Sequence, residues 1–217
     1  GSDVRGRYFV SAGGERMGWF PDKGVRDADM NELIATGDHF GRLAPLRFPV
    51  KDASIMYFPT TTDIRDDGRY LALLISDVPH RELTADTPRA LTVWNMSDST
   101  RHATLWRQTD NSRLSVARFV PKRGWLLGVI RDGERVLGEP EKLANDKLIF
   151  WDMTTTSVVH SLELSQIDSV RFSADGRQLA VAYTEQEDDN LRRSYLSIFS
   201  IGEMKEVHKL PIAPMPS

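Results

Sequence analysis

The clearest pattern in the chain is an apolar run that follows a polar, glycine-containing turn and occurs three times. The three copies lie at residues 66–75, 121–130 and 174–183. When they are aligned, Tyr70, Trp125 and Gln178 take the same position, at intervals of 55 and 53 residues. The runs at 71–75 and 126–130 are apolar on consecutive positions, and a strand with that pattern is typically buried on both faces. The spacing therefore predicts a repeat built around a buried strand.

Three further elements accompany each apolar run in a fixed order. A short strand pattern precedes it, at 115–119 and 169–172 and more weakly at 61–64. An element with an aromatic residue followed by a small polar one comes after it, at 91–96, 148–153 and 196–201. A last strand pattern follows at 101–106, 157–164 and 205–210. Because Gly, Asp, Ser and Asn residues bound these elements, the sequence predicts four short strands per repeat.

Four-stranded sheets that bury both faces against their neighbours, repeated every roughly 40 to 55 residues, are the blades of a β-propeller. We therefore predict an all-β fold with three clear four-stranded blades in residues 60–217 and one irregular or partial blade in residues 1–59 of the same domain. Propellers close with about four to eight blades, so the chain is either a whole small propeller or part of a larger one. In the second case an open blade edge would invite self-association.

The first sixty residues are less regular. Short apolar segments at 8–10 and 17–20 read as the middle strands of an earlier blade, with 43–48 as its outer strand and 54–58 entering the next blade. Between them, 29–37 has the signals of a short helix, with Asp29 as the N-terminal cap, Glu32 three residues later and Gly37 as the stop. We predict a short helix there.

The repeats resemble those of WD40-like β-propeller proteins. The resemblance rests on the turn and strand at 172–181 and on the Trp-Asp pair within 150–152, and it covers about residues 60–210. The sequence lacks the Gly-His pair of a typical WD40 blade, and only one blade has the Trp-Asp pair, so the resemblance is to divergent members. It implies a scaffold or regulatory role. The residues expected to be structural in these repeats are Trp94, Trp151, Phe199, Gly68 and Gly176.

Charge and composition narrow the classes of function. The 217 residues include 28 Lys and Arg against 31 Asp and Glu, a net charge of -3, which argues against a nucleic-acid or anionic-membrane partner. The chain has no cysteine, which excludes disulfides and thiolate chemistry and leaves cytosol and periplasm both open. No apolar run approaches the roughly 18 residues that a membrane helix needs.

The connection between the second and third strands is long in every predicted blade, at 77–89, 131–147 and 185–195. In a propeller these connections lie on one face, and insertions confined to one face often mark a binding surface. Charged loops of mixed sign suit a protein partner, or another domain of the same parent chain, more than a closed pocket. The candidate binding residues are Arg81, Glu82, Arg89, Arg135, Glu141, Asp188, Asp189, Arg192 and Arg193.

Sequence motifs for catalysis are absent. There is no Gly-x-Ser-x-Gly elbow, phosphate-binding glycine loop or His-Glu-x-x-His motif, and the five histidines are scattered. We therefore expect no catalytic residue, metal or cofactor, and favour a non-enzymatic interaction module. The alternative is a propeller enzyme, or a domain that binds a small ligand or metal at the central channel. That alternative would need at least three of five acids to converge: Asp63, Asp77, Asp132, Asp168 and Glu185.

Overall fold

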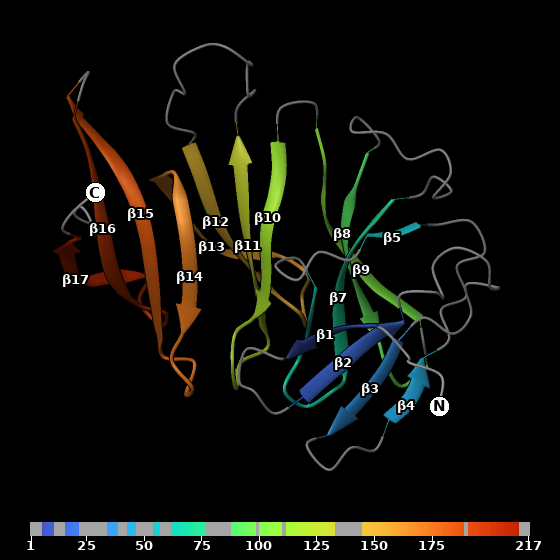
Figure 1. Cartoon of the computed structure of the whole chain (residues 1–217). Coiled ribbons are helices and arrows are strands. Elements are labelled where there is room, and N and C mark those ends of the chain that lie inside the picture. Colours follow the sequence, from blue (N-terminus) through green and yellow to red (C-terminus); the bar gives the residue numbers. More distant parts are fainter. Residues whose placement is uncertain are drawn as a thin grey trace. The chain divides into compact units, whose positions relative to one another are not determined.

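The computed structural model describes residues 6–10, 16–21, 34–38, 43–46, 54–56, 62–76, 88–98, 100–109, 112–132, 145–188 and 191–212. Every regular element in these ranges is a β-strand, and the strands pair into antiparallel sheets (Figure 1). Within them no helix is long and apolar enough to cross a bilayer. The chain divides into two compact units, residues 1–110 with 117–119, and residues 111–116 with 120–217. We describe each unit by itself.

The N-terminal sheet of the first unit has four strands in sequence order. They are β1 (Gly6–Val10), β2 (Arg16–Pro21), β3 (Ile34–Asp38) and β4 (Leu43–Leu46). Each strand pairs with the next one, so the segment at 17–20 lies in a middle strand as predicted, whereas the segment at 8–10 lies in the first strand, at the edge of the sheet. This sheet therefore has the regular strand order of a blade.

The predicted helix at 29–37 is wrong over the residues that the structure describes. Residues 34–37 lie in β3, which pairs with β2 on one side and with β4 on the other. The β-branched Ile34 and Thr36 favour an extended backbone, and pairing on both sides outweighs the local capping signals. Residues 29–33, including the predicted cap Asp29, lie outside the described ranges.

The second sheet of the first unit begins with an interrupted strand. Its elements are β5 (Ser54–Met56), β6 (Asp63–Ile64), β7 (Tyr70–Ser76), β8 (Ala90–Asn95) and β9 (Thr100–Arg107). Both β5 and β6 pair with β7, at different places: Met56 lies opposite Leu74, and Asp63 lies opposite Ala72. Two short pieces thus fill the position of a single first strand. The predicted domain boundary at residue 60 stays a prediction.

The second unit contains two four-stranded sheets, each in sequence order. The first comprises β10 (Ser112–Phe119), β11 (Trp125–Asp132), β12 (Asn145–Asp152) and β13 (Val158–Ser165), with the last residues of β10 assigned to the first unit. The second comprises β14 (Ile167–Phe172), β15 (Gln178–Asp188), β16 (Leu191–Ser200) and β17 (Lys205–Pro211). The predicted four strands per repeat are confirmed, and with them the β-propeller fold class.

The two sheets of the second unit face each other across a shared apolar core (Figure 1). Leu127 and Val129 of β11 are completely buried there, and so are Leu179 and Val181 of β15. Burying each such side chain stabilises the fold by about 1.5–3 kcal/mol. The same core contains Val120, Leu148, Phe150, Ile167, Val170, Tyr183, Phe199 and Ile201.

The glycine turns that introduce the apolar strands have the backbone conformation that glycine allows. Gly68 and Gly176 have φ angles of 71° and 66°. A Cβ atom at Gly176 would lie 1.9 Å from the carbonyl oxygen of Pro121, so both space and conformation require glycine there. The tryptophans Trp94 and Trp151 are buried, as is Phe199.

Candidate functional site

Asp63 is a completely buried carboxylate that joins β6 to the end of β10. Its Oδ2 atom accepts a hydrogen bond of 2.7 Å from the backbone N–H of Phe119. Its Oδ1 atom lies 3.8 Å from Nη1 of Arg118. The pairing of Asp63 with Ala72 of β7 fixes the short strand that presents this side chain. The carboxylate is therefore held against the backbone of a neighbouring strand.

The surroundings of Asp63 raise the pKa of its carboxyl group strongly. Burial raises the pKa of Asp63 to about 7 because the charged form loses its hydration. The Arg118 guanidinium and the N–H of Phe119 lower the pKa, but they do not outweigh burial. A carboxyl group with a pKa near 7 changes its protonation at neutral pH, which suits it to donate or accept a proton.

Two buried polar atoms at this place have no hydrogen-bond partner among the residues that the structure describes. They are Oδ1 of Asp63 and Oγ1 of Thr62. Next to them, Nη1 of Arg118 donates to the carbonyl oxygen of Thr62 at 3.0 Å, and the Arg118 side chain is 25% exposed. Buried polar groups normally bind protein, water or ligand, because leaving one unsatisfied costs about 1–3 kcal/mol. This cluster, Thr62, Asp63 and Arg118, can hold a small polar molecule.

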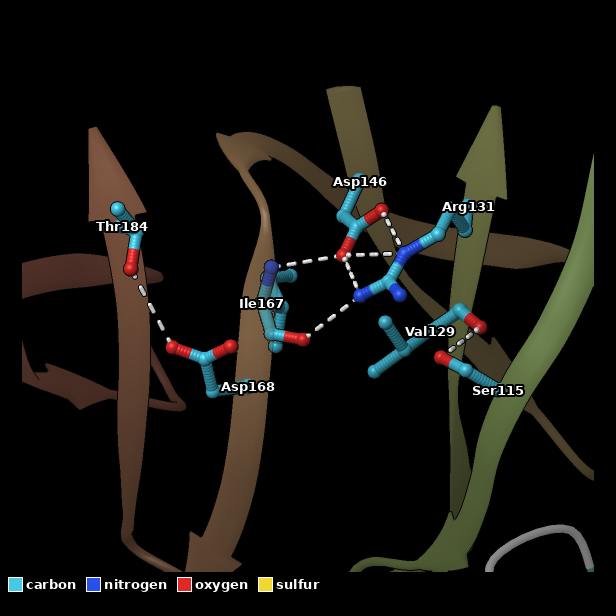
Figure 2. A network of polar contacts seen from close by, with 7 residues as sticks. All are labelled: Ser115, Val129, Arg131, Asp146, Ile167, Asp168 and Thr184. Carbon is cyan, nitrogen blue, oxygen red and sulfur yellow. Dashed lines mark hydrogen bonds and ion pairs between the residues drawn. The ribbon is translucent and has the colours of Figure 1, made fainter. Parts of the chain in front are cut away.

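A second buried acid, Asp146, joins the two sheets of the second unit (Figure 2). Arg131 donates two hydrogen bonds of 2.9 Å to its two carboxylate oxygens. The backbone N–H of Ile167 donates to Oδ2 of Asp146 at 2.7 Å, and the Ile167 carbonyl accepts from Nη2 of Arg131 at 3.0 Å. Because the carboxylate has three good donors, this network is a structural clamp between β12 and β14.

The corresponding place in the β14–β17 sheet is also polar. Thr184 lies opposite Ser194, in the register that Arg131 and Asp146 have in the preceding sheet. The Thr184 hydroxyl lies 3.1 Å from the Ser194 hydroxyl. It also donates to Asp168 at 3.4 Å, as Figure 2 shows. Neutral hydroxyl groups thus replace the ion pair at the equivalent position.

The predicted partner-binding residues fall in different settings. Arg89 lies half-buried just before β8, and Arg192 and Arg193 are exposed in β16. The third predicted loop is largely strand, because β15 extends to Asp188 and β16 begins at Leu191; the prediction of a loop over 185–195 is wrong there. Continuous pairing of the two polar strands satisfies their backbone groups and makes a hairpin of them. The other candidates lie outside the described side chains: Arg81, Glu82, Arg135, Glu141, Asp188 and Asp189.

The five acids expected to converge in an enzyme are divided between the two units or lie outside the described side chains. Asp63 belongs to the first unit, whereas Asp168 and Glu185 belong to the second. Glu185 binds Lys209 with an O to N distance of 2.8 Å. Asp77 and the side chain of Asp132 lie outside the description. Within the described side chains, no three acids or histidines could hold a metal ion together.

Histidines at equivalent positions of two blades lie in different surroundings. The ring of His160 lies 5.5 Å from that of Trp125 and 6.4 Å from that of Phe150, measured between centroids. His208 lies on the exposed strand β17, opposite Ile198. His160 therefore packs against aromatic rings at the sheet surface.

Sequence reasoning did not find most of the polar clusters. Thr62 and Arg118 fall within predicted strand patterns, and Arg131 and Asp146 fall within the long connection predicted at 131–147. The sequence does contain a signal for such clusters, namely a charged residue inside a predicted strand. An acid that is buried in a sheet needs a partner, so its position indicates that a donor lies nearby. Asp63 and Asp168 are the members named from the sequence, as two of the five candidate acids.

The fold defines the class of protein as a β-propeller. No family model and no curated protein matches the sequence. Among solved structures, acylaminoacyl peptidase from Pyrococcus horikoshii matches 96% of this chain with a TM-score of 0.57 and 11% identity, over 32% of its own length. The β-propeller domain of the Trilobed protease from Pyrococcus furiosus matches 96% with a TM-score of 0.54 and 13% identity, over 56% of its length.

A third similar structure is dipeptidyl peptidase 4 from Porphyromonas gingivalis, which matches 95% of this chain with a TM-score of 0.50 and 10% identity, over 32% of its length. This chain thus spans between a third and somewhat more than half of these proteins. At such identities the likeness shows the fold alone, and the finer resemblance to WD40 repeats is not shown.

The comparisons contradict two predictions, that the chain is a non-enzymatic scaffold and that it is not an enzyme. The similar structures described above belong to peptidases. The error has a physical reason, since charged loops on one face of a propeller are equally compatible with a protein-binding surface and with the rim of an enzyme domain.

Proposed function

We propose that this chain is a ligand-binding β-propeller domain of an enzyme, and that the cluster of Thr62, Asp63 and Arg118 binds a small polar, peptide-like ligand. The observation that carries the proposal is the pair of buried atoms without a partner, Asp63 Oδ1 and Thr62 Oγ1, beside a partly exposed guanidinium. The peptidase propellers of similar fold support the enzyme context. The WD40-like character of the repeats, supported by Trp151-Asp152 and the Asp-Gly turns, is part of the proposal.

The chemistry of the cluster suits a ligand with both donors and acceptors. A ligand N–H donates to Oδ1 of ionised Asp63, which already accepts the Phe119 N–H on its other oxygen. A ligand carbonyl or carboxylate accepts from the Thr62 hydroxyl or from the Arg118 guanidinium, whose planar group recognises carboxylates well. Peptides carry both kinds of group. The reacting groups of the enzyme are then supplied by another domain of the parent protein.

Calorimetric titration with short peptides tests this function. The probes are the blocked peptide N-acetyl-trialanine amide and free trialanine, added to the full chain. We expect binding that weakens at least tenfold in Arg118→Gln and in Thr62→Val. The matched control is Arg177→Gln, because the Arg177 side chain is 81% exposed in a turn. Absence of peptide binding, or equal affinity in Arg118→Gln and the control, would contradict the proposal.

A further inference from the structure

Lys209 on strand β17 has an ammonium group that contacts two tyrosine rings and a carboxylate. Its Nζ atom lies 2.8 Å from Oε2 of Glu185. The same atom lies 4.1 Å from the ring centroid of Tyr195 and 5.5 Å from that of Tyr183. We refer to Tyr183, Tyr195 and Glu185, which all lie in the β15–β16 hairpin of the second unit, as the cation cluster. In this structure the cation that it holds is the chain's own lysine.

Strand pairing and hydrogen bonds fix the two rings of the cation cluster. Tyr183 lies directly opposite Tyr195, and their ring centroids are 5.9 Å apart with an angle of 32° between the planes. Tyr183 is almost completely buried in the core between the two sheets of this unit. Its hydroxyl lies 3.3 Å from that of the buried Ser197, which donates to Glu206 at 2.5 Å. The ring of Tyr183 is therefore held by contacts that do not involve Lys209.

The chemistry of the cation cluster favours a positive charge. The face of an aromatic ring attracts a cation, because the ring quadrupole is negative there. The Glu185 carboxylate adds an ionic partner beside the rings. Burial lowers the pKa of Lys209, but the Glu185 carboxylate and the Tyr183 hydroxyl outweigh burial and raise the pKa above its usual value. The cluster thus stabilises the charged form of an amine.

The way in which Lys209 is held allows another cation to replace it. The side chains of Lys209 and Glu185 are each 35% exposed, so solvent reaches the ion pair. Such a pair contributes little to stability, and a lysine side chain loses much rotamer freedom when it is held. A ligand with a primary ammonium offers the same contacts and competes poorly with a tethered group. A methylated ammonium carries no tightly hydrated N–H groups and contacts the ring faces over a larger area.

We propose that the cation cluster binds a small quaternary ammonium compound, and that Lys209 is an internal cation which this ligand displaces. The ligand's methyl groups lie against the ring of Tyr195, and Glu185 balances its charge. The displaced lysine extends into solvent from the exposed strand β17. The cation cluster belongs to the second unit, so the inference does not rest on the peptide site proposed in the first.

Calorimetric titration of the full chain with choline tests this proposal. The matched probe is 3,3-dimethylbutan-1-ol, which has the shape of choline without its charge. We expect saturable binding of choline by the wild-type chain and none of the alcohol. Lys209→Met keeps an apolar stem and removes the internal cation, so it should bind choline about tenfold more tightly. Lys205→Met, on an exposed position of the same strand, is the control and should bind as the wild type does.

Two further variants, each combined with Lys209→Met, locate the ligand. Tyr195→Leu and Glu185→Gln should each weaken choline binding by about tenfold, since one removes the ring face and the other the charge. Glu185→Gln keeps the size of the side chain, so its effect does not depend on repacking of the hairpin. The proposal is overturned if the wild-type chain does not bind choline, even where Lys209→Met does. Equal binding of the uncharged alcohol, or equal affinity in Lys209→Met and Lys205→Met, would also overturn it.

Discussion

Asp63 and Asp146 are both completely buried, but their carboxylates differ in the hydrogen-bond donors that surround them. Asp146 receives two hydrogen bonds from Arg131 and one from a backbone N–H. Asp63 accepts a backbone hydrogen bond from Phe119, and its guanidinium neighbour is 3.8 Å away. The difference in donors means that Asp146 serves the fold, whereas Asp63 is available for a ligand or a proton.

The raised pKa of Asp63 makes stability depend on pH. An acid whose pKa is raised on folding binds its proton more tightly in the folded state, so stability falls as the pH rises from about 4 to about 7. Asp63→Asn keeps a hydrogen-bond acceptor for Phe119 and removes the titration. We expect the loss of stability between pH 4 and pH 8 to shrink by about 2–4 kcal/mol in this variant.

Urea unfolding of the wild-type chain and of Asp63→Asn at several pH values measures this difference. Exposed Asp98→Asn is the matched control, since its carboxylate lies in a surface turn. Parallel pH profiles for wild type and Asp63→Asn would show that Asp63 titrates normally and would refute the prediction.

Removal of the Asp146 carboxylate should leave Arg131 and the Ile167 N–H without their partner. Leaving a buried donor such as the Ile167 N–H unsatisfied costs about 1–3 kcal/mol, whereas the Arg131 side chain is 36% exposed and keeps its hydrogen bond to the Ile167 carbonyl. We expect Asp146→Leu to destabilise the chain by that amount, and the double variant Arg131→Leu/Asp146→Leu to be less harmful than the sum of the single changes Arg131→Leu and Asp146→Leu. Chemical denaturation of the four proteins gives the coupling. Additive effects would mean that the clamp in Figure 2 does not act as a unit.

At the scale of the element, the apolar strands could be predicted from the sequence, whereas strand β3 and the β15–β16 hairpin could not. The apolar runs at 71–75 and 126–130 are buried on both faces as predicted, because consecutive apolar residues leave no solvent face. The predicted helix is wrong over the described residues 34–37 because capping signals are local, whereas β3 is stabilised by two neighbouring strands. The hairpin of β15 and β16 was not predicted, because its charged residues have the composition that is typical of a loop.

Turn glycines should differ sharply in their tolerance of a side chain. Gly176→Ala would place Cβ within 1.9 Å of the Pro121 carbonyl in a left-handed backbone, and we expect a loss of about 2–4 kcal/mol. Gly124→Ala meets nothing within 4 Å and should change stability by less than about 1 kcal/mol. Thermal denaturation of both variants gives the comparison, and equal losses would exclude the close contact between the two turns.

At the scale of the whole molecule, the repeat gave the fold class but not the function. A β-propeller supports many activities, so its loops and composition do not distinguish a scaffold from an enzyme domain. The candidate site was only partly predictable because Thr62 and Arg118 belong to different repeats, 56 residues apart, and one sequence does not reveal which side chains meet. Asp63 was named, but for a cluster of acids that the described residues do not form.

The central claim is that ionised Asp63 accepts a hydrogen bond from a peptide-like ligand, and the most direct measurement is the affinity for N-acetyl-trialanine amide between pH 5 and pH 8. If only the ionised form binds, a pKa of about 7 predicts an affinity that falls by up to about 100-fold from pH 8 to pH 5. Asp63→Asn should bind with little dependence on pH. The same pH dependence in wild type and Asp63→Asn, or no binding at either pH, would contradict the account.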